Sequence, residues 1–500
     1  MLRRLLTGKT FIIAGIVLAL LTVAFYTVEN WRGRRAWEVW RAAAEKRGTK
    51  LFLTDFVAPE IPDSENFAAI PLFRDVFAKL PSGEVAPNPF RLYVDSHDTT
   101  KLPKPPNDIE ARRFDAAGWQ EFFLKTKGLA EKTDSAASDI LRALAKYEPA
   151  MQQVRDASLR PRCKFPTNWE DGAAVRLPHL SCVQALGTHL ALRMNASLAL
   201  GRNADALAEF RLGMRLHAAL SSEPCLIAGL IRISILGRLE GAVWDGLAAG
   251  QWGDAELAAI ESQLASLRFS DDFRFALASE RGFSNTFLLK LVTGSSSEIY
   301  KATGAAFSSG NTFPYHDWTV VHFYPRGWLY RLLIWNNDYF DWFLSRSDGL
   351  GVEPPIAGLP TYLDSDAWRV AHPTHPGVEE FESILMMDSK FVFDTAFRKY
   401  LYAHTRAQET RLACALERFR HAKGAFPEKL EPLIPDFLPT LPKDIFDGQP
   451  LRYRRNPDGG YDLWSIGSDR KDGGGMRAPK DVSDQADDWI WHMPGRAVAP

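Results

Sequence analysis

The feature that most constrains this chain is a run of uncharged, mostly apolar residues at positions 11–28, FIIAGIVLALLTVAFYTV. A helix of that length rises about 27 Å at about 1.5 Å per residue, close to the roughly 30 Å hydrocarbon core of a bilayer. Tyr26 and Trp31 stand near the end of the run, and aromatic side chains favour the membrane interface. The run therefore predicts a transmembrane helix that holds the remaining chain beside a membrane.

A cleaved signal peptide is the alternative interpretation of the run. Such a peptide has a shorter apolar region that ends in a small-x-small site. Here only Thr22-Val23-Ala24 comes near that pattern, and it lies inside the run. An uncleaved anchor is therefore favoured.

The basic residues that flank the run give a weak signal for orientation. They are balanced on its two sides, so the positive-inside bias nearly cancels. Those before the run are Arg3, Arg4 and Lys9, and those after it are Arg32, Arg34 and Arg35. The tail at residues 1–10 is short, which is typical of a signal anchor. We expect a single-pass protein of a bacterial inner membrane, with a cytoplasmic N-terminus and its bulk in the periplasm.

Residues 32–375 are predicted to form a largely helical extracytoplasmic domain. The formal net charge is −1, and no domain-wide basic field is present, so nucleic acid is not an expected partner. A second apolar stretch at 225–244 is interrupted by Arg232, Arg238 and Glu240. A charge at a bilayer centre costs at least ~2.5 kcal/mol, so this stretch predicts a buried helix.

Two further features of this domain leave alternatives open. Cys163 and Cys182 flank a loop, and a disulfide between them is an option outside the cytosol. The stretch after Pro325 predicts a helix with a broad aromatic side. One interpretation of that side is a face that binds a partner or rests on a membrane. The favoured interpretation is the inner face of an ordinary core helix. Its residues are Trp328, Leu332, Trp335, Tyr339 and Trp342.

The clearest helical signal is a pair of amphipathic helices at 180–222, joined by GRNA. Gly201 supplies the left-handed residue that commonly ends a helix. The pair resembles a tetratricopeptide-type hairpin, although no second copy follows at a 34-residue period. The resemblance is carried by Ala191, Ala196, Leu200, Gly201, Ala206 and Phe210.

The C-terminal region, 380–492, begins with a long helix predicted at about 388–423, which Gly424 ends. Its further pattern resembles the C-terminal half of the type II secretion major pseudopilins, which implies a long helix followed by short antiparallel strands. Ile445 departs from the pattern, which has Pro there. The matching residues are Gly424, Phe426, Pro427, Leu430, Leu433, Leu441, Pro442, Asp444, Phe446, Gly448, Pro450, Tyr453, Tyr461, Leu463, Ser465, Gly467 and Asp469.

A pseudopilin carries its membrane helix at the start of this same long helix, after a cleavage site followed by a Glu. Here the apolar run lies far upstream and lacks that Glu. We therefore expect a pseudopilin-like module on a different anchored protein. The predicted fold class is mainly α, with an N-terminal transmembrane helix, a helical tetratricopeptide-like central domain and a small α+β pseudopilin-like C-terminal module.

The loop after the last predicted hairpin strand is rich in Asp and Gly. Oxygen donors on a flexible backbone suit Ca²⁺, which takes six to eight oxygen ligands. Pseudopilins use the corresponding loop to bind calcium, and by position this resemblance assigns Asp469 and either Asp487 or Asp488 as ligands. The alternative is a solvated acidic loop without an ion.

The sequence contains no P-loop, GxGxxG, GxSxG or HExxH motif, and no catalytic or cofactor-binding residue is assigned. Two stretches could supply metal ligands, one with His372 and His375 and the other with His316, Asp317 and His322. The favoured function is a membrane-anchored scaffold or interaction protein linked to secretion or envelope assembly. The alternatives are an exported metal-dependent hydrolase that uses these histidines and a helical-repeat adaptor facing the cytosol.

Overall fold

The computed structural model describes residues 8–78, 90, 114–126, 128–295, 297–299, 324–346, 371–373, 389–475 and 488–496. Within them the protein is mainly helical, with one three-stranded antiparallel sheet near the C-terminus. The principal helices are α1 (Gly8–Lys46), α2 (Pro71–Asp75), α3 (Ala116–Lys125), α4 (Ala136–Leu144), α5 (Glu148–Ser158), α6 (Pro178–Ala199), α7 (Asn203–Ala219), α8 (Leu226–Ala249), α9 (Asp254–Ala265), α10 (Phe269–Thr293), α13 (Arg326–Arg346) and α16 (Ser389–Lys423). The strands are β1 (Arg452–Arg455), β2 (Tyr461–Ser465) and β3 (Trp489–Met493).

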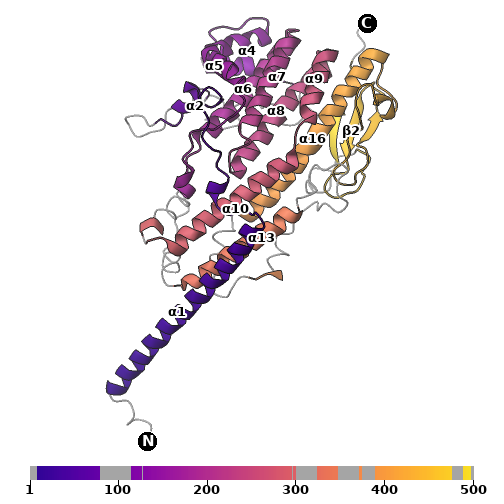
Figure 1. Ribbon diagram of the computed structural model, residues 1–500. Helices are drawn as coiled ribbons and strands as arrows, with labels where there is room; N and C mark the ends of the chain where they lie inside the picture. The colour runs from indigo at the N-terminus through magenta and orange to yellow at the C-terminus, as the bar shows by residue number, and fades with distance from the viewer. Residues whose placement is uncertain are drawn as a thin grey trace.

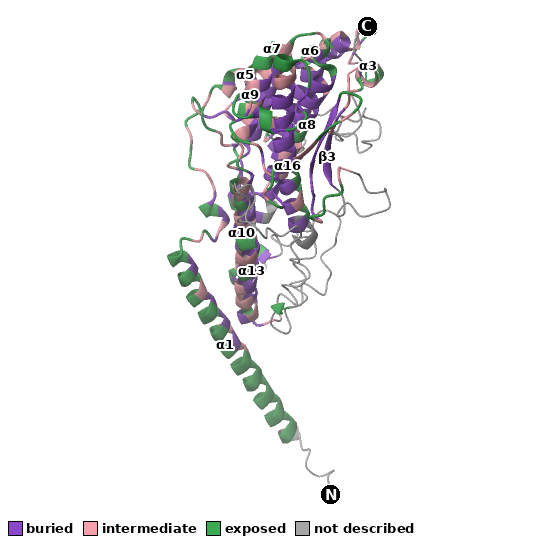
Figure 2. Ribbon diagram, turned by 90° about the vertical axis from the view of Figure 1, so that its right-hand side faces the viewer, coloured by how far each residue is buried: buried purple, intermediate pink, exposed green. Residues whose placement is uncertain are grey.

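Helix α1 is one continuous helix that leaves the body of the protein (Figure 1). Its N-terminal part, which holds the apolar run, is exposed along its length, whereas its C-terminal part lies against α13 (Figure 2). Among the described residues, α1 is the one helix long and apolar enough to cross a membrane. The predicted apolar helix is confirmed, and it continues without a break to Lys46.

Helices α6, α7 and α8 pack together in the upper part of the body, away from the N-terminal end of α1 (Figure 1). The predicted hairpin of α6 and α7 is confirmed, and Gly201 adopts the expected left-handed conformation at the end of α6, with φ of 69°. Helix α8 packs closely on both, because Gly187 and Gly213 leave room for Ile235 and Leu239. The second apolar stretch is thus a buried helix, as predicted.

The C-terminal sheet lies beside α16 (Figure 1). Helix α16 ends at Gly424, which has φ of 84°, and β1, β2 and β3 pair in that order. Every residue of β2 is buried, because the central strand is covered by its neighbours and by α16. Helix α16 also packs against α8 and α9, so it forms part of the core of the helical body.

One continuous cluster of buried apolar side chains runs from Trp37 in α1 to Met493 in β3. Leu332, Trp335 and Tyr339 of α13 belong to it, which confirms that α13 is mainly a core helix. All four cysteines are free thiols, so the disulfide considered between Cys163 and Cys182 is not formed.

Candidate functional sites at the α1–α13 junction and the acidic loop

Glu29 is the first charged residue after the apolar run, and α13 buries its side chain. Its carboxylate accepts a hydrogen bond from Trp328 Nε1 at 3.2 Å. It also pairs with Arg32 at 3.0 Å and with Arg331 at 3.6 Å. A buried carboxylate is costly unless charged and polar groups compensate it, so these partners fix where α1 meets α13.

Asn30, the next residue, caps the start of α13. Its Oδ1 atom accepts a hydrogen bond from the backbone N–H of Gly327 at 2.9 Å. The first-turn N–H groups of a helix have no partner within the helix, and a cap usually comes from the residue just before it. Here the cap comes from a residue 297 positions away in sequence, so the middle of α1 orders the start of α13.

The backbones of α1 and α13 touch at a pair of glycines. A Cβ atom at Gly33 would lie 2.0 Å from the carbonyl oxygen of Gly327, and a Cβ atom at Gly327 would lie 1.9 Å from the carbonyl oxygen of Glu29. No side chain larger than hydrogen fits at either position without separating the helices. The two glycines therefore set the spacing of the junction.

Beyond the glycines, residues of increasing number in α1 contact residues of increasing number in α13, which shows that the two helices run parallel. Trp40 Nε1 donates to Asp338 at 3.1 Å, and Arg47 lies 3.9 Å from Asp341. Asp341 also pairs with Arg281 of α10 at 2.7 Å. The junction thus continues from the end of the apolar run into the helical body.

A buried amide cluster joins α13 to α10. Asn285 donates to Asn337 at 2.9 Å and to the carbonyl oxygen of Leu51 at 2.9 Å. Asn336 and Asn337 in turn donate to Asn285 Oδ1, at 3.2 Å and 2.7 Å. A connected set of buried hydrogen bonds gives a specific arrangement, so α1, α10 and α13 are held as one unit.

The second candidate site is built around Asp444, in the turn before β1. Its buried carboxylate accepts hydrogen bonds from the backbone N–H groups of Phe446 and Ile466 and from Ser465 Oγ, all within 3.0 Å. Arg452 Nη1 donates to it at 2.9 Å. Burial raises the pKa of Asp444, and these donors oppose that rise. Asp444 therefore ties the turn to the end of β2.

Arg452 compensates the negative charge around this turn. Its guanidinium also pairs with Asp447 at 2.5 Å and with Asp472 at 3.6 Å. The hydrogen bond from Trp464 Nε1 lowers the pKa of Asp472, and Arg452 adds to that effect. One internal cation thus faces three carboxylates, including one from the acidic loop.

Asp488, a predicted calcium ligand, is buried at the start of β3. Its two oxygens accept hydrogen bonds from the backbone N–H groups of Gly473 at 3.2 Å and Gly475 at 2.8 Å. Burial raises the pKa of Asp488, and the nearby carboxylates of Asp472 and Asp469 raise it further. Asp469 thus lies close enough to Asp488 to act on its pKa, and the assignment of the two residues as calcium ligands stays a prediction.

These residues alone do not complete a metal site. In the described part of the chain, no group of three His, Cys, Asp or Glu side chains is arranged to hold an ion. Both oxygens of Asp488 already accept backbone hydrogen bonds. Asp487, the third predicted ligand, lies outside the described residues.

Most of the predicted histidine ligands also lie outside the described residues: His316, Asp317, His322 and His375. His372 is exposed, and its backbone carbonyl accepts a hydrogen bond from Trp335 Nε1 at 2.7 Å. That contact uses the main chain and does not involve the imidazole as a ligand.

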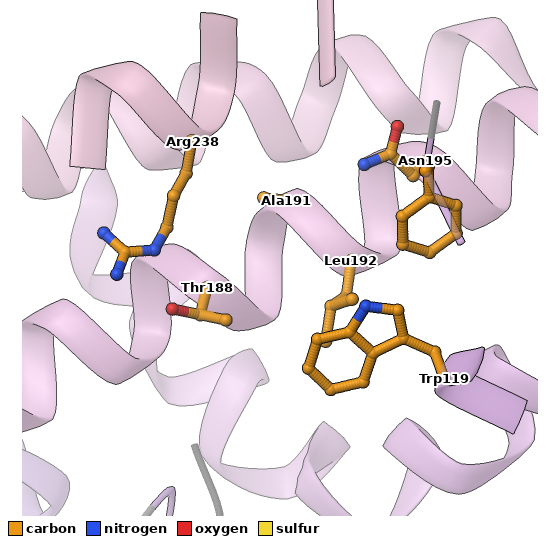
Figure 3. Close-up of a pocket in the computed structure, with 7 residues that line it drawn as sticks. Trp119, Thr188, Ala191, Leu192, Asn195 and Arg238 are labelled. Carbon is orange, nitrogen blue, oxygen red and sulfur yellow. The ribbon is translucent and has the colours of Figure 1, made fainter. Parts of the chain in front are cut away.

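A small cavity lies between α3, α6 and α8 (Figure 3). Its volume is about 20 Å³, enough for about one water molecule and far below the roughly 300–1,000 Å³ of a typical ligand pocket. Trp119 and Leu192 form apolar walls, and Arg238 and Asn195 add polar groups. Arg238 bonds to Ser234 of its own helix. The cavity suits a bridging water better than a substrate.

Sequence reasoning missed the residues of the junction between α1 and α13. The available signal was the position of Glu29, a lone carboxylate directly after an uncharged run, because an ionisable residue beside a membrane usually has a specific partner. The partners Gly327 and Trp328 could not be inferred, since nothing in either stretch of sequence points to the other.

Comparison of the chain with models of protein families, with curated proteins and with solved structures finds no match. The similarity to pseudopilins and to tetratricopeptide hairpins therefore rests on the residues quoted for it.

Proposed function

We propose that this chain is a single-pass scaffold or interaction protein of a bacterial inner membrane. Its N-terminus faces the cytoplasm, its helical body lies in the periplasm, and its role is linked to secretion or envelope assembly. The observation that carries the proposal is α1. One part of this helix carries the uncharged, mostly apolar run, in which seventeen of the eighteen residues are exposed, and the next part is built into the protein core.

The rigidity of the junction supports a scaffold. A tethered enzyme needs only a flexible linker that lets it reach its substrate. Here the glycine pair, the Asn30 cap and the Glu29 contacts join the apolar helix directly to α13. Such a junction holds the body in one orientation relative to the membrane, which suits a protein that presents a surface to a partner.

The link to secretion is supported by the C-terminal region. A long helix precedes a small antiparallel sheet, in the order that the resemblance to pseudopilins implies. Asp444, Gly448 and Gly467, which match that pattern, form the turns that position the strands: Asp444 bonds across to Ile466, and both glycines have positive φ.

We also propose that Ca²⁺ binds at the acidic loop of Asp469 and Asp488. The raised pKa of Asp488, to which two neighbouring carboxylates contribute, indicates negative charge that a divalent cation would relieve. Because the described residues do not complete the site, the proposal requires a further ligand such as Asp487, or movement of Asp472 away from Arg452.

The full-length protein in spheroplasts tests the anchor and its orientation together. We expect the intact chain to remain with membranes after alkaline carbonate washing, and external protease to digest the body in spheroplasts but not in intact cells. Release by carbonate would contradict the anchor. Full protection of the body in spheroplasts would instead support the cytosolic adaptor.

Metal analysis of the purified protein separates the scaffold from the alternative hydrolase. Zinc or iron in stoichiometric amount would favour the hydrolase with ligands among His316, His372 and His375. Calcium alone, or no bound transition metal, agrees with the scaffold.

A further inference from the structure

The first turn of α13 lies level with the end of the apolar run. The rings of Phe25 and Trp328 are 6.2 Å apart, so Trp328 reaches a residue inside the run. Gly327 contacts Asn30 and Gly33, which lie about 3 and 7.5 Å beyond residue 28 at about 1.5 Å per residue. A headgroup layer is roughly 5–8 Å thick on each side of the hydrocarbon core. The start of α13 therefore falls within that layer.

This part of the surface carries an excess of positive charge. Five arginines, at 32, 34, 35, 326 and 331, face two glutamates, at 29 and 38, which leaves a net charge of 5 − 2 = +3. Arg32 and Arg331 pair with Glu29, and Arg34 pairs with Glu38. Neither Arg35 nor Arg326 pairs with a carboxylate in the described part of the chain, and both are exposed.

Aromatic side chains accompany these charges. Trp31 is 68% exposed although it follows the apolar run directly. Tyr324 and Trp328 are half-buried and lie 5.5 Å apart. Trp and Tyr concentrate at the interface between lipid and water, and basic residues near a membrane attract anionic lipids. The same surface combines both properties at the depth where headgroups lie.

We propose that this surface binds the headgroups of anionic phospholipids and so fixes the tilt of the body on the membrane. We call it the headgroup collar: Trp31, Arg34, Arg35, Tyr324, Arg326 and Trp328. The proposal rests on the anchor proposed above and adds a lipid class to it. Since α1 and α13 are in backbone contact, lipid bound at the collar acts on the orientation of the whole body.

The test uses the full-length protein in phosphatidylcholine vesicles. Spin-labelled phosphatidylglycerol and phosphatidylcholine are compared by their relative association with the protein. We expect a preference for phosphatidylglycerol of at least about fivefold, because one Lys or Arg near an anionic surface contributes about 1 kcal/mol. The double variant R35Q/R326Q should reduce that ratio toward one.

The matched control is R41Q/R211Q, which removes the same charge from residues outside the α1–α13 contacts described above; Arg211 is exposed on α7. Arg41 lies thirteen residues beyond residue 28 on the same helix, about 20 Å from the run and beyond a Debye length of about 8 Å. The control should keep the preference of the wild type. Circular dichroism and melting of both variants establish that they are folded.

The outcomes separate the two proposals. A protein that carbonate extracts from the vesicles overturns the anchor and the collar together. An inserted protein with no lipid preference, or with a preference that both double variants reduce equally, overturns the collar alone.

Discussion

The two ends of the chain are joined to the helical body by different kinds of contact. At the N-terminal junction, α1 and α13 meet through a glycine pair and through hydrogen bonds such as that from Gly327 to Asn30. At the C-terminal junction, β3 and the residues after it are held by two arginines, of which Arg406 is buried and Arg496 half-buried. Arg406 of α16 donates to the carbonyl oxygen of Ile490 at 2.9 Å, and Arg496 pairs with Glu417 at 2.8 Å.

The N-terminal junction therefore depends mainly on shape, and the C-terminal junction depends mainly on charge. Backbone contact at the glycines leaves no space for a side chain. By contrast, Arg406 is 2% exposed and compensates Glu409, which is fully buried. The two junctions should therefore respond to different substitutions.

The largest effect is expected at the charged junction, from Arg406→Met. Loss of the guanidinium removes the cation that pairs with the buried Glu409 and removes the hydrogen bond to Ile490. Removing one partner of a buried ion pair typically costs about 3–5 kcal/mol. Urea unfolding of the detergent-solubilised protein measures the loss.

The control for this substitution is Arg41→Met, which removes a pair with Glu45 that is exposed on both sides. Exposed pairs contribute about 0–1 kcal/mol, so this variant should stay close to the wild type. Equal losses in the two variants would show that the C-terminal junction does not depend on buried charge.

At the N-terminal junction we expect Gly33→Leu to destabilise the protein by about 1–3 kcal/mol. The new side chain must push α13 away, because its Cβ would lie 2.0 Å from the Gly327 carbonyl oxygen. Cross-linking or distance measurement between α1 and α13 should report a wider separation, and melting should report the loss of stability.

Gly15→Leu is the matched control, since a Cβ atom at Gly15 meets nothing within 4 Å. It adds the same side chain to the same helix, inside the apolar run. Membrane insertion of both variants should match the wild type. The shape-based account fails if Gly33→Leu leaves stability and helix separation unchanged.

These junctions show how far the sequence could predict the structure. The apolar helix, the α6–α7 hairpin with Gly201 at its end, and the long α16 ending at Gly424 were all predicted, because each depends on a local pattern. The contacts of Gly33 with Gly327 and of Arg406 with Ile490 were not predicted. Each joins segments far apart in the chain, and a glycine or an arginine in a helix carries no mark of its distant partner.

The predicted calcium loop lies between these two cases. The resemblance assigned Asp469 and either Asp487 or Asp488 as ligands, and in the structure the carboxylates of Asp472 and Asp469 both raise the pKa of Asp488. The sequence did not indicate that Arg452 would pair with Asp444, Asp447 and Asp472. A local motif identifies residue types, whereas the balance of charge around them depends on the folded neighbours.

The charged junction should also make stability depend on pH. Burial raises the pKa of Glu240 to about 8 from 4.5, an effect that Arg406 opposes and Glu409 increases. The folded state therefore keeps a proton that the unfolded chain releases. The stabilisation that results is fully present below pH 4.5. As the pH rises from 4.5 toward 8 the free energy of unfolding falls by up to about 1.4 kcal/mol per pH unit.

Two histidines act in the opposite direction at acidic pH. Burial lowers the pKa of His189 to about 3 and that of His404 to about 4, from 6.5. Their contribution is present above pH 6.5 and is lost as the pH falls toward these values. Taken together, Glu240, His189 and His404 predict that the free energy of unfolding is largest near pH 6.5.

Glu240→Gln isolates the alkaline part of this profile. We expect the variant to lose less stability than the wild type between pH 6.5 and 8, because Gln has no proton to release. Urea unfolding at a series of pH values measures the slope. If the slope of the free energy of unfolding against pH is unchanged in the variant, another group causes the loss of stability above pH 6.5, and Glu240 does not contribute to the charge balance of this junction.

The smallest effect is expected from calcium, because binding must compete with contacts that already exist. Asp488 accepts two backbone hydrogen bonds and Asp472 faces Arg452, so an ion must displace some of these donors. At ten times its dissociation constant, Ca²⁺ should stabilise the full-length protein by about 1.4 kcal/mol. Asp488→Asn should abolish that gain, whereas Asp436→Asn, at an exposed position outside the loop, should keep it. Equal stabilisation of the wild type and both variants by Ca²⁺ and by Mg²⁺ would show only general screening of charge. Arg452 alone would then compensate the carboxylates of this loop.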